Sequence, residues 1–158
     1  MAKYDIEEGQ YQLRGARFAI VCAKFNHAIT DKLNEGAIAA LARHGVREDA
    51  IDTVRVPGAF ELPIAASRIA AAGKVDAVIT LGAVIRGGTP HFEYVCQECA
   101  RGVMDVGLEH DLPVIFGVLT TDDLAQAVER TGGSEGHKGE EAAIAAMEMV
   151  SLLRSLKS

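Results

Sequence analysis

Residues 82–95, GAVIRGGTPHFEYV, hold the residue types and the spacing best suited to chemistry. An apolar, strand-like run ends at two adjacent glycines, which let a backbone approach a ligand closely. Thr89 then suits a helix N-cap and Pro90 the first helical position, so the amides at this helix start favour an anion such as phosphate. His91 falls in the first turn, where it could transfer a proton. An ordinary capped helix carrying a surface histidine would explain the same residues.

Two other segments carry residues that a simple turn does not require. KFNH (24–27) places Phe25, one of five phenylalanines, where its ring could stack on a planar ligand. PGAFELP (57–63) places Phe60 and Glu61 beside a Pro-Gly bend, where backbone groups and a carboxylate could meet a polar heterocycle. Packing in the core is the alternative explanation of both aromatic residues.

A glycine-rich stretch, ERTGGSEGHKGEE (129–141), is bounded by the cations Arg130 and Lys138. Guanidinium and ammonium groups suit phosphate and hydroxyl partners, although solvated loop charges would have the same sequence. The stretch is not a Walker loop, because Gly139 stands where that motif requires serine or threonine. The sequence also lacks a dinucleotide-binding fingerprint, a nucleophile elbow and a metal-ligand spacing, so we expect no metal site.

Alternating strand-like and helix-like segments must position these residues. Short apolar runs predict strands at 17–23, 51–56, 76–82 and 113–119, each covered on both faces, and periodic segments predict helices at 29–44, 61–72, 90–110, 121–130 and 138–156. This order predicts an α/β fold, a flavodoxin-like three-layer α/β/α sandwich around a central, mainly four-stranded parallel sheet. Ligands of such sheets bind beyond the carboxyl ends of the strands, where the segments described above fall.

Length and charge restrict the class of protein further. We expect residues 1–158 to form one domain, with 1–15 as a polar tail unless a neighbouring subunit gives it a strand edge. The net charge of −6 and the absence of a basic run argue against nucleic acid as a partner. The acidic N-terminus lacks a signal-peptide pattern and no apolar run is long enough to span a bilayer, so we expect a cytoplasmic protein with no membrane partner.

Three cysteines in such a chain predict reduced thiols rather than a disulfide framework. Cys22 lies in an apolar strand and is expected in the core. Cys96 and Cys99 have the spacing of a redox or half-zinc motif, but the second pair that a zinc site needs is absent. We therefore expect both to be small apolar residues on a buried helix face.

The segments FN, VPGAFELP, TLGAVIRGGTPHFEYV, FGVLTT, AVERTGG and HKGEEAA resemble, in order and spacing, the 6,7-dimethyl-8-ribityllumazine synthase family. The resemblance covers about residues 17–156. It implies a transferase that condenses 5-amino-6-(D-ribitylamino)uracil with 3,4-dihydroxy-2-butanone 4-phosphate, the penultimate step of riboflavin biosynthesis, without a cofactor. The amino group of the substrate is the nucleophile, so the protein needs to supply orientation, a proton shuttle and an anion cradle.

The resemblance also assigns residues to a pocket between adjacent subunits. His91 matches the proton-transfer residue, and Gly88, Thr89 and Arg130 match the residues that hold the phosphate. The remaining positions match the site of the ribitylaminouracil: Phe25, which stacks on the pyrimidine, together with Ala59, Phe60, Glu61, Ala83, Val84, Ile85, Phe116 and Lys138.

The resemblance further implies a homopentamer, and some family members close pentamers into an icosahedral shell. The short spacing from Arg130 to Lys138 is that of shell formers, but GGSEGHKG replaces their usual GTKAGNKG, with Ser134 for a lysine and His137 for an asparagine. Two other functions stay open on the sequence: a flavin- or lumazine-binding protein without turnover, and a shell-forming structural protein of the same fold.

Overall fold

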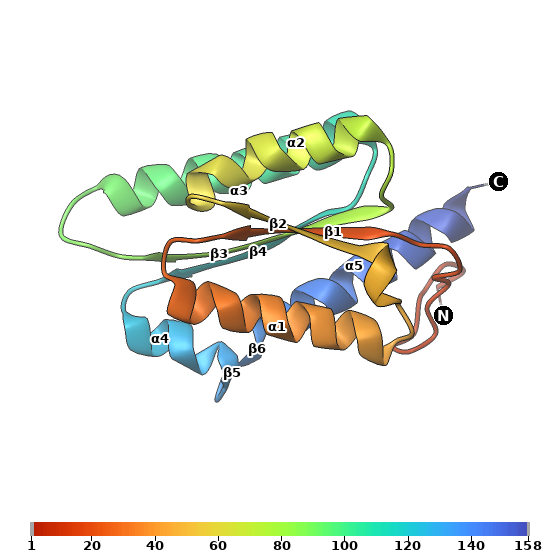
Figure 1. Cartoon of the computed structure of the whole chain (residues 1–158), viewed down its shortest axis with the longest axis horizontal. Helices are drawn as coiled ribbons and strands as arrows, with labels where there is room; N and C mark the ends of the chain where they lie inside the picture. Colours follow the sequence, from red (N-terminus) through yellow and green to blue (C-terminus); the bar gives the residue numbers. More distant parts are fainter. Residues whose placement is uncertain (1, 158) are drawn as a thin grey trace.

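The computed structural model describes residues 2–157 and has a four-stranded parallel sheet between two layers of helices (Figure 1). In chain order the elements are β1 (Phe18–Ala23), α1 (His27–Arg43), the 3-10 helix η1 (Glu48–Ala50), β2 (Ile51–Val56), the 3-10 helix η2 (Ala59–Glu61), α2 (Leu62–Ala72), β3 (Ala77–Ile85), α3 (His91–His110), β4 (Val114–Thr121), α4 (Leu124–Glu129), β5 (Thr131–Gly133), β6 (Gly136–His137) and α5 (Lys138–Leu156). The predicted α/β sandwich is confirmed. Residues 1 and 158, the two ends of the expected domain, lie outside the described residues.

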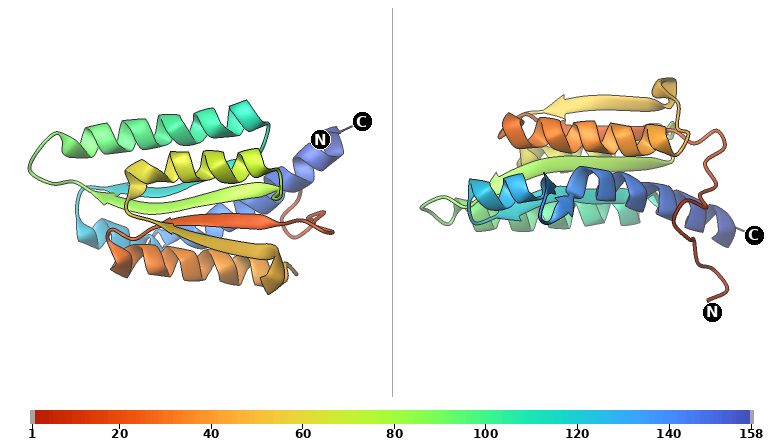
Figure 2. Two further views of the ribbon diagram at one scale, coloured as in Figure 1. Left: turned by 45° about the horizontal axis from the view of Figure 1, so that its top comes forward. Right: turned by 90° about the horizontal axis from the view of Figure 1, so that it is seen from below.

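The strand order β2-β1-β3-β4 places all four carboxyl ends at one edge of the sheet. Helices α2 and α3 cover one face, and α1, α4 and α5 lie against the other (Figures 1 and 2). A short antiparallel pair, β5 and β6, stands apart from the main sheet. The loops that follow β1, β2 and β3 are therefore brought together, as the sequence predicted.

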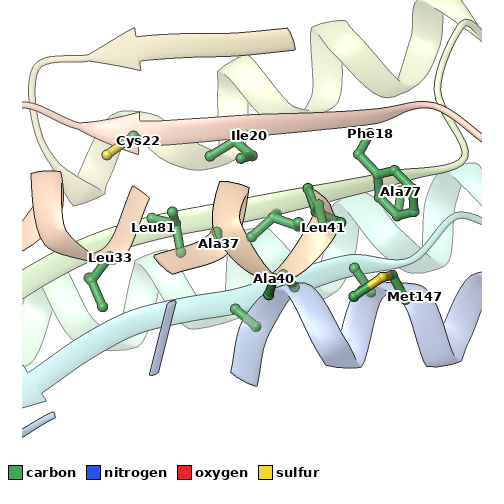
Figure 3. Close-up of a cluster of buried hydrophobic side chains, with 14 of the residues drawn as sticks. Phe18, Ile20, Cys22, Leu33, Ala37, Ala40, Leu41, Ala77, Leu81 and Met147 are labelled. Carbon is green, nitrogen blue, oxygen red and sulfur yellow. The ribbon is translucent and has the colours of Figure 1, made fainter. Parts of the chain in front are cut away.

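The central strand β1 is buried on both faces because it lies between β2 and β3 under two helix layers. Phe18, Ile20 and Cys22 point toward α1 and α5, where they pack with Leu41 and Met147 among others (Figure 3). The alternate residues of β1 face α2 and α3 instead. The prediction that Cys22 is a core residue is confirmed.

The expectation that every strand is covered on both faces is wrong for β2. Its residues from Asp52 to Arg55 are exposed, and Val54 is 38% exposed. β2 is an edge strand that packs mainly on β1, and the helix layers lie over the other strands, so the faces of β2 stay open to solvent. Phe116 on the opposite edge strand, β4, is also exposed. Edge position cannot be read from a strand's own residues, although the polar residues of IDTVRV are consistent with it.

Two boundaries differ by three residues from those predicted, and the others by two at most. β3 continues through Gly82 to Ile85, because its pairing with β4 extends to Ile85 opposite Thr121. The same pairing delays the next helix, so α4 begins at Leu124 rather than at residue 121; the side chain of Asp123 caps it by accepting a bond from the Gln126 amide at 2.9 Å. Gly82 is thus an interior strand glycine, and a Cβ there would lie 3.3 Å from Leu62 Cδ1.

Hydrogen bonds to α5 hold the polar N-terminal segment at Gln12 and Arg14. The Gln12 amide donates to Ser151 Oγ at 2.8 Å, and Arg154 donates to the carbonyls of Gln12 and Arg14. Residues 2–10 run away from the rest of the molecule and form no strand (Figure 2). Pairing of this tail with another subunit stays a prediction.

Candidate active site

A cleft of about 810 Å³ lies at the carboxyl ends of β1, β2 and β3, beside the first turns of α3. It brings together segments that are far apart in the sequence. Its lining residues are Phe25, Pro57, Gly58, Ala59, Phe60, Glu61, Ala83, Val84, Ile85, Gly87, Thr89, His91, Phe92, Tyr94 and Val95. Nine of the thirteen residues that the sequence nominated for the site are among them, which are all but Gly88, Phe116, Arg130 and Lys138.

Three hydrogen bonds place Phe25 at the mouth of this cleft. The Lys24 and Phe25 amides donate to the carbonyls of Val56 and Pro57, at 2.8 and 3.0 Å. Asn26, in the left-handed conformation with φ of 60°, donates from Nδ2 to the Ala83 carbonyl at 2.8 Å. The Phe25 ring is 71% exposed, so the alternative that this aromatic belongs to the core is wrong. A rigid, exposed ring over a cleft is suited to stacking on a planar ligand.

Further parts of the cleft wall come from η2 and from the end of β3. Phe60 is 57% exposed and lines the cleft, so it is not a core residue either. Glu61 is half-buried, and its amide donates to the Gly58 carbonyl at 3.2 Å. The residues of β3 after Gly82 also form part of the cleft wall, because the strand continues to Ile85. The surface thus offers backbone groups and one carboxylate, a set able to bind a polar heterocycle.

The turn before α3 forms the end of the cleft. Thr89 Oγ1 accepts a bond from the His91 amide at 3.4 Å. His91 lies in the first turn of the helix, as predicted, but the helix begins one residue later than expected, with Pro90 rather than Thr89 at the N-cap. Within residues 2–157, the amides of Gly88 and Thr89 have no acceptor. Gly87 and Gly88 do not have a left-handed φ, and a Cβ on either would meet no heavy atom within 4 Å. Neither backbone conformation nor packing within the chain therefore requires glycine at these two positions. The open space beside the free amides suits an anion.

Three of the four other nominated residues lie in a second hollow, and Gly88 lines neither space. Phe116, Arg130 and Lys138 line a space of about 380 Å³ between β4, the end of α4 and the start of α5. The two spaces share no lining residue. Within one chain, therefore, the sequence-predicted site residues form two separate groups.

The glycine-rich stretch is structured, although its residues 132–136 are exposed. The pair β5 and β6 folds it into a hairpin, and the Lys138 amide donates to the Arg130 carbonyl at 2.8 Å. This bond joins the backbones of the two residues at the base of the hairpin, and both side chains line the second hollow. The Arg130 guanidinium also donates to the Gln126 carbonyl at 2.9 Å, which fixes its direction.

Sequence reasoning missed several residues of the two hollows. Glu141 lines the second one, and its carboxylate lies 3.2 Å from Lys138 Nζ. Phe92, Tyr94 and Val95 line the first; Tyr94 and Val95 follow His91 by three and four positions, so helical spacing could have found them. Pro57 and Gly58 lie in the PGAFELP segment but were not singled out.

The two cysteines of α3 are not a reactive pair. Cys99 is fully buried, and burial raises the pKa of its thiol to about 11. Cys96 is only half-buried, so the prediction of two buried thiols holds for Cys99 alone; burial raises the pKa of Cys96 as well. Neither thiol is a good nucleophile near neutral pH. Among residues 2–157, no group of three histidine, cysteine or acidic side chains is placed to hold a metal ion.

The fold and the cleft define an open α/β protein that binds its ligand at the carboxyl edge of a parallel sheet, with an exposed histidine at a helix start. The model of the 6,7-dimethyl-8-ribityllumazine synthase family matches residues 15–154. The chain belongs to this family. It is a transferase with lumazine synthase activity in riboflavin biosynthesis, and the family binds substrates and assembles into oligomers.

One further observation concerns the membrane. No helix within residues 2–157 is both long and apolar enough to cross a bilayer.

Proposed function

We propose that the chain condenses 5-amino-6-(D-ribitylamino)uracil with 3,4-dihydroxy-2-butanone 4-phosphate to give 6,7-dimethyl-8-ribityllumazine, phosphate and water. The observation that carries this proposal is the cleft in which Phe25, the η2 segment and the end of β3 face His91. Its volume of about 810 Å³ is in the range of small-molecule sites. Residues 1–158 as one domain and a cytoplasmic location stay predictions.

The cleft supports one orientation of the pyrimidine substrate. Phe25 stacks on the uracil ring, and Ala59, Phe60 and Glu61 hold it together with the ribityl group from one side. Ala83, Val84 and Ile85, at the end of β3, supply further backbone groups. The reacting amino group then points toward the start of α3.

The butanone phosphate occupies the end of the cleft beside α3. The free amides of Gly88 and Thr89 hold its phosphate, since they have no acceptor within residues 2–157. Arg130 adds a forked cation, but it lies in the second hollow of its own chain. We therefore assign Arg130, Phe116 and Lys138 to the cleft of an adjacent copy.

Such a shared site requires head-to-tail contacts between subunits, which close into rings. We propose a homopentamer, in line with the exposed apolar side chains Met104 and Leu108 on α3, 62% and 75% exposed. Assembly of pentamers into an icosahedral shell remains part of the proposal, because the spacing from Arg130 to Lys138 is short.

In this mechanism the amino nitrogen of the pyrimidine attacks the ketone carbon, and loss of water gives an imine. His91 moves a proton that allows phosphate to leave from the β-position, with the C–O bond electrons going to the departing phosphate. The enol that remains tautomerises to a ketone, the ribitylamino nitrogen attacks this carbonyl carbon, and loss of a second water closes the second ring. The protein supplies orientation and proton transfer, and general acid–base groups typically contribute about 10²- to 10⁴-fold.

The test is a steady-state assay with both substrates that follows lumazine fluorescence and phosphate release together. His91→Ala should lower kcat by about 10²-fold or more with the KM values largely kept. Arg130→Ala should mainly raise the KM for the butanone phosphate. His27→Ala is the matched control, because His27 is also exposed and opens a helix but lies outside the cleft. The reverse pattern for His91 and Arg130 would contradict the assignment.

The same assay separates the alternative functions. A flavin- or lumazine-binding protein would bind the pyrimidine without releasing phosphate from the butanone phosphate. A purely structural shell protein would do neither.

A further inference from the structure

Three segments of the chain meet at Arg86, the residue that follows β3. Its amide donates to the Thr121 carbonyl at the end of β4, at 2.8 Å. Its guanidinium donates from Nε to Asp122 Oδ1 at 2.9 Å, and from Nη1 to Glu93 Oε1. The guanidinium carbon also lies 4.4 Å from the centre of the Phe92 ring. Arg86 thus joins the ends of β3 and β4 to the first turn of α3.

Arginine is suited to this position because its planar fork serves two carboxylates and an aromatic face at once. The pKa of Glu93 is below its ordinary value, chiefly because Arg86 donates to its carboxylate. Isolated surface ion pairs contribute little to stability, but here one ordered side chain holds groups from three segments. The contacts therefore determine the relative position of these segments more than they determine overall stability.

The loop that Arg86 begins is the one that carries the proposed phosphate site. Residues 86–90 project beyond the edge of the sheet and connect β3 to His91 (Figure 2). All five of these residues are exposed, and the four from Gly87 to Pro90 have few partners to hold them. Arg86 is bonded at the near end of the loop, and Phe92 and Glu93 rest on its guanidinium at the far end. One side chain therefore closes the loop at both ends.

We infer that Arg86 is a positioning residue that fixes the first turn of α3, and with it His91 and the Gly88–Thr89 amides, over the carboxyl ends of the strands. Arg86 does not line the cleft, and its Nε and Nη1 donors are engaged by Asp122 and Glu93, so we expect it to act through His91 rather than as a ligand of the phosphate. The expected effect of Arg86 on catalysis rests on the proposed function. Its expected effect on the position of the first turn of α3 does not.

The kinetic test compares Arg86→Gln and Arg86→Lys with Arg101→Gln. Arg101 is the matched control, because it also pairs with two carboxylates, Glu98 and Asp105, but all three lie on α3 and join no other segment. Arg86→Gln should lower kcat by about 10- to 100-fold, the effect of misplacing a reacting group by about 1 Å, with the KM for the pyrimidine kept within about twofold. Arg86→Lys should recover part of kcat, since it keeps the charge without the fork. Arg101→Gln should match the wild type.

A second measurement does not depend on catalysis. Hydrogen exchange of the amides in residues 92–96 should be faster in Arg86→Gln than in the wild type, and unchanged in Arg101→Gln. Sedimentation of every variant should give the wild-type assembly, and loss of assembly confined to Arg86→Gln and Arg86→Lys would overturn the inference.

The remaining outcomes are distinguishable. Unchanged exchange together with unchanged kcat in Arg86→Gln would overturn the inference. A raised KM for the butanone phosphate with kcat kept would instead make Arg86 a phosphate ligand. If the wild type showed no turnover, the proposed function would fail, and exchange alone would still decide the role of Arg86.

Discussion

Substitution of Gly36 by alanine tests how α1 and α5 fit together next to the second hollow. Gly36 is buried on α1, and a Cβ there would lie 2.0 Å from Cε1 of His137 and 2.6 Å from each of its ring nitrogens. Ordinary contacts of a Cβ lie at 3.4–4 Å. The ring would have to retreat by well over an ångström. His137 is also the N-cap of α5, because its Nδ1 accepts a bond from the Glu140 amide at 3.3 Å.

Three contributions set the size of the effect. Loss of the cap costs about 1 kcal/mol, and crowding in a packed region costs about 1–3 kcal/mol. Alanine favours the helix over glycine by about 1 kcal/mol, which offsets part of this cost. Gly36→Ala should therefore lower the free energy of unfolding by about 1–3 kcal/mol, measured by urea denaturation at a fixed protein concentration.

The companion substitution His137→Asn makes the reasoning refutable. Asparagine is smaller than histidine and is itself a good N-cap, so in this background Gly36→Ala should be neutral or stabilising. Gly139→Ala is the control: its Cβ would lie 2.1 Å from the Leu33 carbonyl oxygen, a backbone clash that His137→Asn cannot relieve. Additive effects of Gly36→Ala and His137→Asn would show that the ring is not the obstacle.

Two further outcomes concern the loop before α3 and the buried thiol. Gly88→Ala should leave the free energy of unfolding unchanged or raise it by about 0.4–1 kcal/mol, because its Cβ meets no atom within 4 Å. Its KM for the butanone phosphate should nevertheless rise in steady-state assays; an unchanged KM would place the anion elsewhere. Burial raises the pKa of Cys99 from 9.0 to about 11, so the folded state holds this proton more tightly than the unfolded state. The resulting stability is fully present below pH 9 and is lost as the pH rises to about 11, by about 2–3 kcal/mol. Urea titrations should show this loss in the wild type and a smaller one in Cys99→Ala, and equal losses would contradict a buried thiol.

The elements of the fold were predictable because their signals are local. Short apolar runs and periodic segments identify the strands and helices, and parallel strands necessarily place their carboxyl ends at one edge. Phe25, Glu61 and His91 could therefore be assigned to one cleft from the sequence alone. The exposure of β2 could not be predicted, because it depends on which strand becomes its neighbour.

The resemblance implied a pocket between adjacent subunits, but the sequence did not show which residues lie together in one chain. The resemblance placed Phe116, Arg130 and Lys138 with the other site residues, but the fold puts them in a separate hollow of the same chain. Only the path of β4 and the β5–β6 hairpin in space determines this.

The sequence by itself determined the order of strands and helices, the turn that opens α3 and the residue types at each strand end, because each follows from neighbouring residues. The tertiary structure alone decided which distant groups meet. Asp122 approaches Arg86 because the pairing of β3 with β4 extends to residue 121, and the His137 ring occupies the space left by Gly36 because α5 packs on α1. Contacts of this kind depend on the relative placement of whole elements, which no local pattern encodes.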